Sequence, residues 1–121
     1  MTSQRTKANE VKARGHDPTM LILTSLASGQ KHGYALLLDI EGFAGVRLGP
    51  GTLYGAITRL EERGLIEPLE PEGRTRPYRL TAAGAVTLES ALAELRSIVD
   101  EATARLQVRI RPEVTSSAGI A

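Results

Sequence analysis

The sequence contains no cysteine and no tryptophan, and only one phenylalanine and three tyrosines occur among its 121 residues. Without cysteine the chain has no disulfide, no zinc–thiolate site and no cysteine nucleophile. With so few aromatic residues, leucine and alanine must fill most of the core, which favours packing between helices. The two histidines, His16 and His32, have no neighbours at the spacing of metal ligands. The composition therefore predicts no metal site and no cofactor.

Long apolar runs are also missing from the sequence. No run approaches the ~20 residues that a membrane-spanning helix needs, and the N-terminal residues lack the apolar core of a signal peptide. We therefore expect a cytoplasmic protein with no membrane partner. With 121 residues, the chain has room for one domain with tails.

Charge is nearly balanced over the whole chain but unevenly placed. The net charge is +1, yet residues 1–35 carry five basic and two acidic side chains, whereas residues 81–107 carry two basic and four acidic ones. A basic end favours an anionic partner on that side. Charge alone fits a soluble domain with a basic tail equally well. We interpret residues 1–16, with Arg5, Lys7, Lys12 and Arg14, as a flexible basic arm, or as a helical extension that is ordered only on contact.

The stretch LGPGTLYGAITRLEERGLI, residues 48–66, predicts a helix with a marked start and end. Gly49 is an acceptable N-cap, and Pro50 suits the first helical position because its missing N–H is not needed there. Gly64 supplies a C-terminal stop. Four apolar residues share one helical face: Leu53, Ala56, Ile57 and Leu60. One side of this helix is expected to pack in the core, which leaves the other side for a partner.

Two shorter helices are predicted before this stretch. Asp17 caps and Pro18 begins a mostly apolar helix that continues to Ala27. A second helix is predicted from about His32 to Glu41, with an inward face made of Tyr34, Leu37, Leu38 and Ile40. Residues 46–48 are too few for an independent strand, but they could add one to a small sheet.

A β-hairpin is predicted after residue 64. Residues 65–69 and 75–80 have the length and apolar pattern of strands, and residues 70–74 combine proline and glycine as a turn requires. Two strands alone are marginally stable. The hairpin must therefore pack on the helices.

A long last helix is predicted from Ala82 to about Gln107, with Thr81 as its cap. At 1.5 Å per residue it would be roughly 39 Å long, which is more than the preceding domain can cover. We therefore expect part of its apolar heptad to meet a second subunit; the alternative is a helix folded back over its own domain. The predicted dimerisation residues are Leu88, Leu92, Leu95, Val99, Ala102 and Leu106. Residues 108–121 are expected to form a disordered tail.

The order of these elements predicts the fold class: mainly α with a small β-hairpin, in the form of a winged helix-turn-helix domain. This domain is expected over residues 17–80 and a dimerisation helix over residues 81–107. In such domains the helix after the turn enters the DNA major groove and the hairpin, or wing, reaches the backbone. Small groups and the positive dipole end at the helix start favour close approach to DNA. Glu61 and Glu62 at the other end would repel DNA.

Three motifs together resemble the PadR-type transcriptional regulators: HGYALLLDI, LGPGTLYGAITRLEERGLI and GRTRPYRLTAAG. The resemblance covers residues 20–106, and the short C-terminal part resembles the family's small subgroup. It implies a dimeric bacterial DNA-binding repressor, in a family whose members often respond to small ligands. It also implies that Tyr34 and Tyr54 lie near DNA and that Thr52 is a recognition-helix hydroxyl. Gly49 and Gly55 depart from the common Ser/Thr cap and proline.

The candidate DNA-contacting residues combine this resemblance with position on the helices and wing. They are Lys31, His32, Tyr34, Gly51, Thr52, Tyr54, Arg59, Arg74 and Arg76. Three alternatives remain open at this stage. Tyr54 can rest with its hydroxyl in water, Tyr34 can pack in the core, and Arg59 can pair with an acidic neighbour.

The main alternative function is a winged-helix module that binds another protein, because a net charge of +1 is small for a DNA-binding protein. Arginines on the wing and the basic arm favour double-stranded DNA as the partner. An enzyme is not expected. The sequence has no nucleophile–base pair, no GxxxxGK phosphate loop and no metal-ligand set.

Overall fold

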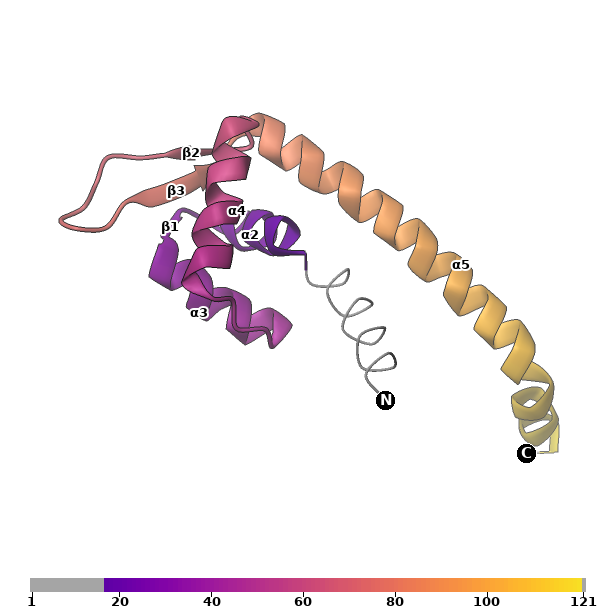
Figure 1. Cartoon of the computed structure of the whole chain (residues 1–121). Coiled ribbons are helices and arrows are strands. Elements are labelled where there is room, and N and C mark those ends of the chain that lie inside the picture. The colour runs from indigo at the N-terminus through magenta and orange to yellow at the C-terminus, as the bar shows by residue number, and fades with distance from the viewer. Residues whose placement is uncertain (1–16, 121) are drawn as a thin grey trace, which may run out of the picture. The chain divides into compact units, whose positions relative to one another are not determined.

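The computed structural model describes residues 17–120, with side chains described as far as residue 109, so the predicted arm over residues 1–16 lies outside the described residues (Figure 1). The fold is mainly helical with a small antiparallel sheet, which confirms the predicted class. The elements follow in the order α2 (Pro18–Leu26), β1 (Lys31–His32), α3 (Gly33–Ala44), α4 (Pro50–Glu62), β2 (Ile66–Pro68), β3 (Pro77–Leu80) and α5 (Ala82–Ile120).

Helix α2 begins where the sequence predicted. The Asp17 side chain caps it by accepting a hydrogen bond from the backbone N–H of Thr19 at 3.0 Å, and Pro18 occupies the first helical position. The helix is apolar on nearly all sides and is buried from Leu21 to Leu23 and again at Ser25 and Leu26. It therefore forms the centre of the helical core, in contact with both α3 and α4.

The predicted start and buried face of helix α4 are also confirmed. Gly49 is the N-cap, Pro50 is the first residue, and the four predicted apolar side chains are at most 2% exposed. At the other end Gly64 adopts a φ of 73°, a left-handed conformation that glycine allows without strain. The Leu65 N–H can then donate to the Leu60 carbonyl at 3.0 Å, which closes the helix end.

The predicted inward face of the second helix was wrong in part. Leu36 and Ile40 are fully buried in α3, whereas Tyr34 and Leu38 are exposed. The helix begins at Gly33, with His32 as its cap, and this start places positions 33, 36 and 40 toward the core. The run from Ala35 to Leu38 is apolar on several sides, so hydrophobicity alone did not fix which side is buried.

The wing, defined here as residues 66–80, is a hairpin joined by a third strand. The sheet order is β1–β3–β2, all antiparallel, with Ile66 opposite Leu80 and Lys31 opposite Tyr78. The third strand is thus β1 and not residues 46–48, which the sequence suggested. Val46 and Leu48 instead contribute side chains to the core. This segment is therefore held by side-chain packing and not by backbone hydrogen bonds to a neighbouring strand.

Helix α5 begins at the predicted cap. The Thr81 hydroxyl accepts from the Gly84 N–H at 3.0 Å and donates to the Gly64 carbonyl at 2.7 Å, which ties the helix start to the end of α4. Leu88 lies in the core of the winged domain at 7% exposure, so its predicted place in a dimer interface was wrong. It lies only two turns beyond the cap, still over the domain.

The rest of α5 differs from the expected end near Gln107. The helix continues to Ile120, so the segment after residue 107, expected to be a disordered tail, is helical in the structure. The described part of the chain divides into two compact units, one ending at Leu88 and the other beginning at Glu89.

The burial of α4 makes a direct prediction about stability. Leu53→Ala should lower the free energy of unfolding by about 2–5 kcal/mol, because it leaves a cavity in a fully packed core. Thr58→Ala, on the exposed face of the same helix, should change it by no more than about 0.5 kcal/mol. Urea unfolding followed by circular dichroism measures both. Equal effects of the two substitutions would contradict the assigned faces.

Candidate nucleic-acid interface

The outward face of α4 presents small and polar groups in its first turns. Gly51 and Thr52 are exposed, and a Cβ added to Gly51 would meet no atom within 4 Å. Tyr54 is 49% exposed, as expected from the burial of its neighbour Leu53. Of the two acidic residues at the far end of the helix, Glu62 is exposed and Glu61 is partly buried.

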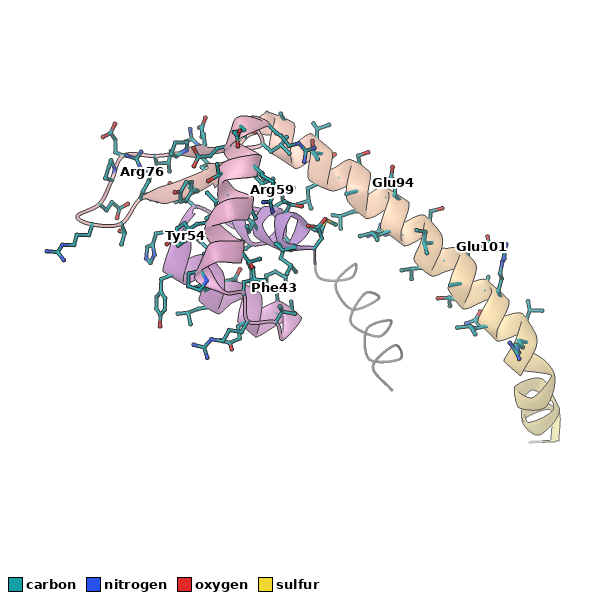
Figure 2. All side chains as sticks on the ribbon, in the orientation of Figure 1. Phe43, Tyr54, Arg59, Arg76, Glu94 and Glu101 are labelled. Carbon is teal, nitrogen blue, oxygen red and sulfur yellow. The ribbon has the colours of Figure 1, made fainter. Side chains whose placement is uncertain are left out.

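Tyr54 and Arg59 lie on different sides of this helix. Figure 2 shows Tyr54 and Arg76 on the wing side of α4, and Arg59 on its other side. Arg59 lies five positions after Tyr54, and this spacing turns the two side chains well over a quarter circle apart on a helix. The structure therefore brings Tyr54 together with the wing and leaves Arg59 outside that group.

A hollow of about 240 Å³ opens between the first turn of α3, the side of α4 and the wing. It gathers five of the sequence-predicted residues, whereas Lys31, Gly51, Thr52 and Arg59 lie outside it. No residue that lines the hollow carries a carboxylate. The lining residues are His32, Gly33, Tyr34, Tyr54, Arg74, Thr75, Arg76 and Tyr78. The hollow is thus lined by two arginines, three tyrosines and the start of a helix, a combination that suits an anion.

The two wing arginines that line the hollow, Arg74 and Arg76, differ in their contacts. Backbone hydrogen bonds between Glu72 and Thr75 close the tip, at 2.7 and 3.1 Å. Arg76 donates from Nη1 to the Leu69 carbonyl at 3.2 Å, across the hairpin. Arg74 is exposed and forms no salt bridge with any residue whose side chain is described. Its charge is therefore available at the edge of the hollow.

A third arginine of the wing is used differently. Arg79 pairs with Glu67 on the neighbouring strand, with Nε donating to the carboxylate at 3.0 Å. The two residues lie directly opposite in the ladder. This pair cancels its own charge. Arg74 and Arg76 are then the remaining basic groups of the wing, and the exposed Glu70 and Glu72 partly offset them.

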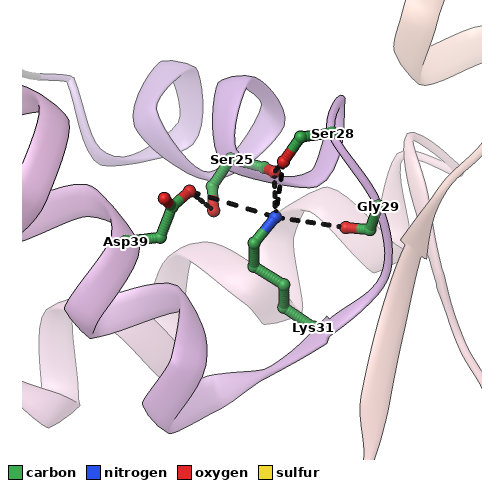
Figure 3. Close-up of polar contacts among 5 residues, drawn as sticks. All are labelled: Ser25, Ser28, Gly29, Lys31 and Asp39. Carbon is green, nitrogen blue, oxygen red and sulfur yellow. Dashed lines mark hydrogen bonds and ion pairs between the residues drawn. The ribbon is translucent and has the colours of Figure 1, made fainter.

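Lys31 points into the protein and not toward a partner (Figure 3). Its ammonium donates to the Ser25 carbonyl, to Ser28 Oγ at 2.8 Å and to the Gly29 carbonyl at 3.4 Å. It also lies 3.9 Å from Asp39, whose carboxylate accepts from Ser25 Oγ at 2.6 Å. A cation at the carboxyl end of α2 satisfies carbonyls that the helix leaves without partners. The geometry gives Lys31 a structural role and does not support its predicted contact with DNA.

His32 acts as a helix cap. Its Nδ1 accepts a hydrogen bond from the Ala35 N–H at 3.4 Å. Within residues 17–109, no three histidine or acidic side chains gather in a way that could hold a metal ion. In the same described part of the chain, no helix is both long and apolar enough to cross a bilayer.

Tyr78 and Gly33 are parts of this site that the sequence did not single out. Tyr78 is 9% exposed, and its hydroxyl makes no hydrogen bond to the described residues. Burial raises the pKa of Tyr78 above its ordinary value of 10, and the negative charges of Glu61 and ionised Tyr54 raise it further against the opposing effect of Arg76. The sequence signal was the alternation of Tyr78 and Leu80, which predicted only an inward face.

The fold and the placement of this site define a winged helix-turn-helix protein. Residues 22–90 match the transcriptional regulator PadR-like family. The match covers more than half of the chain, and the chain therefore belongs to this family.

Two curated proteins are similar to most of this chain. An uncharacterized protein encoded in a transposon of Streptomyces fradiae is 54% identical over 76 residues, which are 63% of this chain and 22% of that protein. The transcriptional regulator YqjI of Escherichia coli is 32% identical over 88 residues, or 71% of this chain and 42% of that protein. The chain thus spans less than half the length of these relatives.

Solved structures share the fold over most of their own length. A PadR family transcriptional regulator from Eggerthella lenta has a TM-score of 0.70 and 25% identity, covering 88% of this chain and 96% of that one. A PadR family regulator from Clostridium difficile has a TM-score of 0.67 and 26% identity, covering 74% of this chain and 97% of that one.

The raised pKa of Tyr78 predicts how stability depends on pH. A phenol with a higher pKa in the folded state stabilises the fold fully below its unfolded pKa, and this contribution is lost as the pH rises through the folded value. Wild-type protein should therefore lose more stability than Tyr78→Phe between about pH 9 and pH 11. Urea unfolding at both pH values measures the free energy of unfolding. Equal losses in the two proteins would contradict the buried environment assigned to the Tyr78 hydroxyl.

Proposed function

We propose that this protein regulates transcription by binding double-stranded DNA with α4 and the wing. The observation that carries the proposal is the hollow beside α4, which is lined by Arg74, Arg76 and three tyrosines with no carboxylate among the lining residues. This charge pattern suits a DNA backbone phosphate. A chain of net charge +1 needs such a local concentration of basic groups to hold DNA.

The exposed first turns of α4 suit the major groove. Gly51 has open space above it, and the Thr52 side chain is exposed, so the helix backbone can approach base edges closely. The acidic end with Glu62 is directed away from the phosphates in this arrangement. Phosphate contacts by the wing and the start of α3 supply most of the affinity, and contacts by Thr52 and its neighbours supply sequence preference.

We infer that the protein binds DNA as a homodimer joined through α5. Within residues 89–109, the predicted dimerisation residues Leu92, Leu95, Val99, Ala102 and Leu106 are exposed. They recur at heptad spacing, as in helices that pair with one another. A dimer presents two copies of α4 to half-sites about 34–36 Å apart, so a pseudo-palindromic promoter site is expected. Occupying such a site blocks transcription, which makes the protein a repressor.

A small effector would act on this dimer by changing the angle between the two winged domains. The support for this step is the membership of the chain in the PadR-like family and the length of α5, which links each winged domain to the proposed dimer contact. Release of DNA then follows from a change in half-site spacing and needs no contact between effector and DNA-binding residues.

A protein-binding winged helix is the second candidate. It is favoured by the exposed apolar side chains Leu38 and Phe43 on α3. The two functions differ in their dependence on salt, because DNA binding releases counterions and an apolar protein contact does not.

A salt series tests the DNA-binding proposal. Binding to a duplex from the upstream region of the protein's own gene should weaken steeply with salt, with a log–log slope of about 0.9 per phosphate neutralised. Arg74→Ala should make this slope shallower by roughly 1 per subunit. Arg79→Ala is the matched control, since this arginine is already paired with Glu67, and should change the slope much less.

Two outcomes would overturn the proposal. One is a wild-type protein that does not bind the duplex at low salt, or binds with a flat salt slope. The other is an equal loss of slope for Arg74→Ala and Arg79→Ala, which would mean that the hollow has no special part in binding.

Sedimentation velocity tests the proposed dimer. Leu95→Asp places a charge in the apolar heptad and should convert a wild-type dimer to monomer. Ser97→Asp adds the same charge to the same helix, but about 200° round the axis from Leu95, and should remain dimeric. A dimer that survives Leu95→Asp would show that α5 does not join the subunits through this face.

A further inference from the structure

Gly33, the first residue of α3, lies directly against the ring of Tyr54 from α4. Gly33 is buried, and a Cβ built on it would lie 2.8 Å from Cζ of Tyr54 and 3.1 Å from Cε1, and closer still to the hydroxyl oxygen. Carbon atoms in contact prefer a separation of about 3.5–4.0 Å. No side chain larger than hydrogen fits at position 33 while Tyr54 keeps this position.

The backbone does not itself require glycine at this position. The positive-φ glycines of the described chain are Gly29, Gly45, Gly64 and Gly73, so Gly33 has the ordinary backbone of a helical residue. Glycine in a helix is less favourable than alanine because it loses more freedom on folding. The reason for glycine here is therefore the space that the Tyr54 ring occupies.

This contact decides where the Tyr54 hydroxyl lies. The ring crosses from α4 to the start of α3, and its hydroxyl reaches the hollow that Arg74, Arg76 and Tyr78 also line. The ring nevertheless keeps half of its surface open to solvent. A side chain at position 33 would have to displace this ring from its present position or separate α3 from α4.

We propose that Gly33 is a positioning residue for DNA binding, because its missing side chain seats the Tyr54 ring and thereby sets the hydroxyl at the edge of the hollow. The inference rests on the proposed function, since it assigns Tyr54 to the DNA-binding face. Gly33 acts through Tyr54 and makes no contact of its own with DNA.

A double-mutant cycle on the full chain tests this inference. The variants are Gly33→Ala, Tyr54→Ala and the double variant, each titrated with a mixed-sequence duplex of about 30 base pairs, long enough for two half-sites. Gly33→Ala should raise the Kd about tenfold, as expected for the loss of one good contact. In the Tyr54→Ala background the same glycine substitution should have no further effect, because the ring that it displaces is absent.

Gly42→Ala is the matched control. This glycine lies in the same helix, and a Cβ added to it would meet no atom within 4 Å. Its Kd should stay within about twofold of wild type. The inference is overturned if Gly33→Ala binds as well as Gly42→Ala, or if Gly33→Ala weakens binding equally in the presence and absence of Tyr54.

Two further measurements separate folding and function. If Gly33→Ala does not fold, adding Tyr54→Ala should restore a cooperative thermal transition. Failure to do so would contradict the proposed contact between position 33 and the Tyr54 ring. In wild-type protein without DNA, a nuclear Overhauser effect should join the Gly33 α-protons to the Tyr54 ring protons. Absence of this effect overturns the proposed contact between Gly33 and the Tyr54 ring, even if the protein binds DNA. Its presence in a protein that binds no DNA overturns the proposed function and leaves only a structural contact.

Discussion

The burial of one face of α4 is the constraint on which the rest of the structure depends. Leu53, Ala56, Ile57 and Leu60 are packed against α2, α3 and the sheet with almost no exposure. Apolar burial of this extent is the dominant stabilising contribution in a small domain with few aromatic residues. Because these four side chains fix the rotation of the helix, they also fix which residues face outward. The partner surface is thus determined by the core.

The neighbouring elements then turn this outward face into a site. The start of α3 meets the ring of Tyr54, and β1 pairs with β3 so that the wing stands beside the same helix. Thr81 ties the end of α4 to the start of α5. Lys31 holds the carboxyl end of α2 in place, so a residue with the charge expected of a DNA contact serves the fold instead. The basic groups that line the hollow are those of the wing, Arg74 and Arg76.

The sequence predicted the parts of the fold that depend on local signals. The caps at Asp17 and Thr81, the apolar face of α4 and the hairpin were all confirmed, because capping chemistry and periodicity act over a few residues. The buried side of α3 was predicted only in part, and the third strand was missed. A helix with a continuous apolar run can bury any of several faces, so the pattern did not decide which side of α3 is buried. A strand of two residues is too short to show the alternation that predicts strands. The contact of Gly33 with Tyr54 joins two helices, so no local pattern could reveal it.

The central claim is that DNA meets the first turns of α4 and the wing, and amide chemical-shift mapping tests it most directly. On titration of labelled protein with the duplex at low salt, the largest shifts should fall on residues 51–55 and 74–76, with little change in α2. Shifts centred instead on Leu38 and Phe43 of α3, or an unchanged spectrum, would contradict the account.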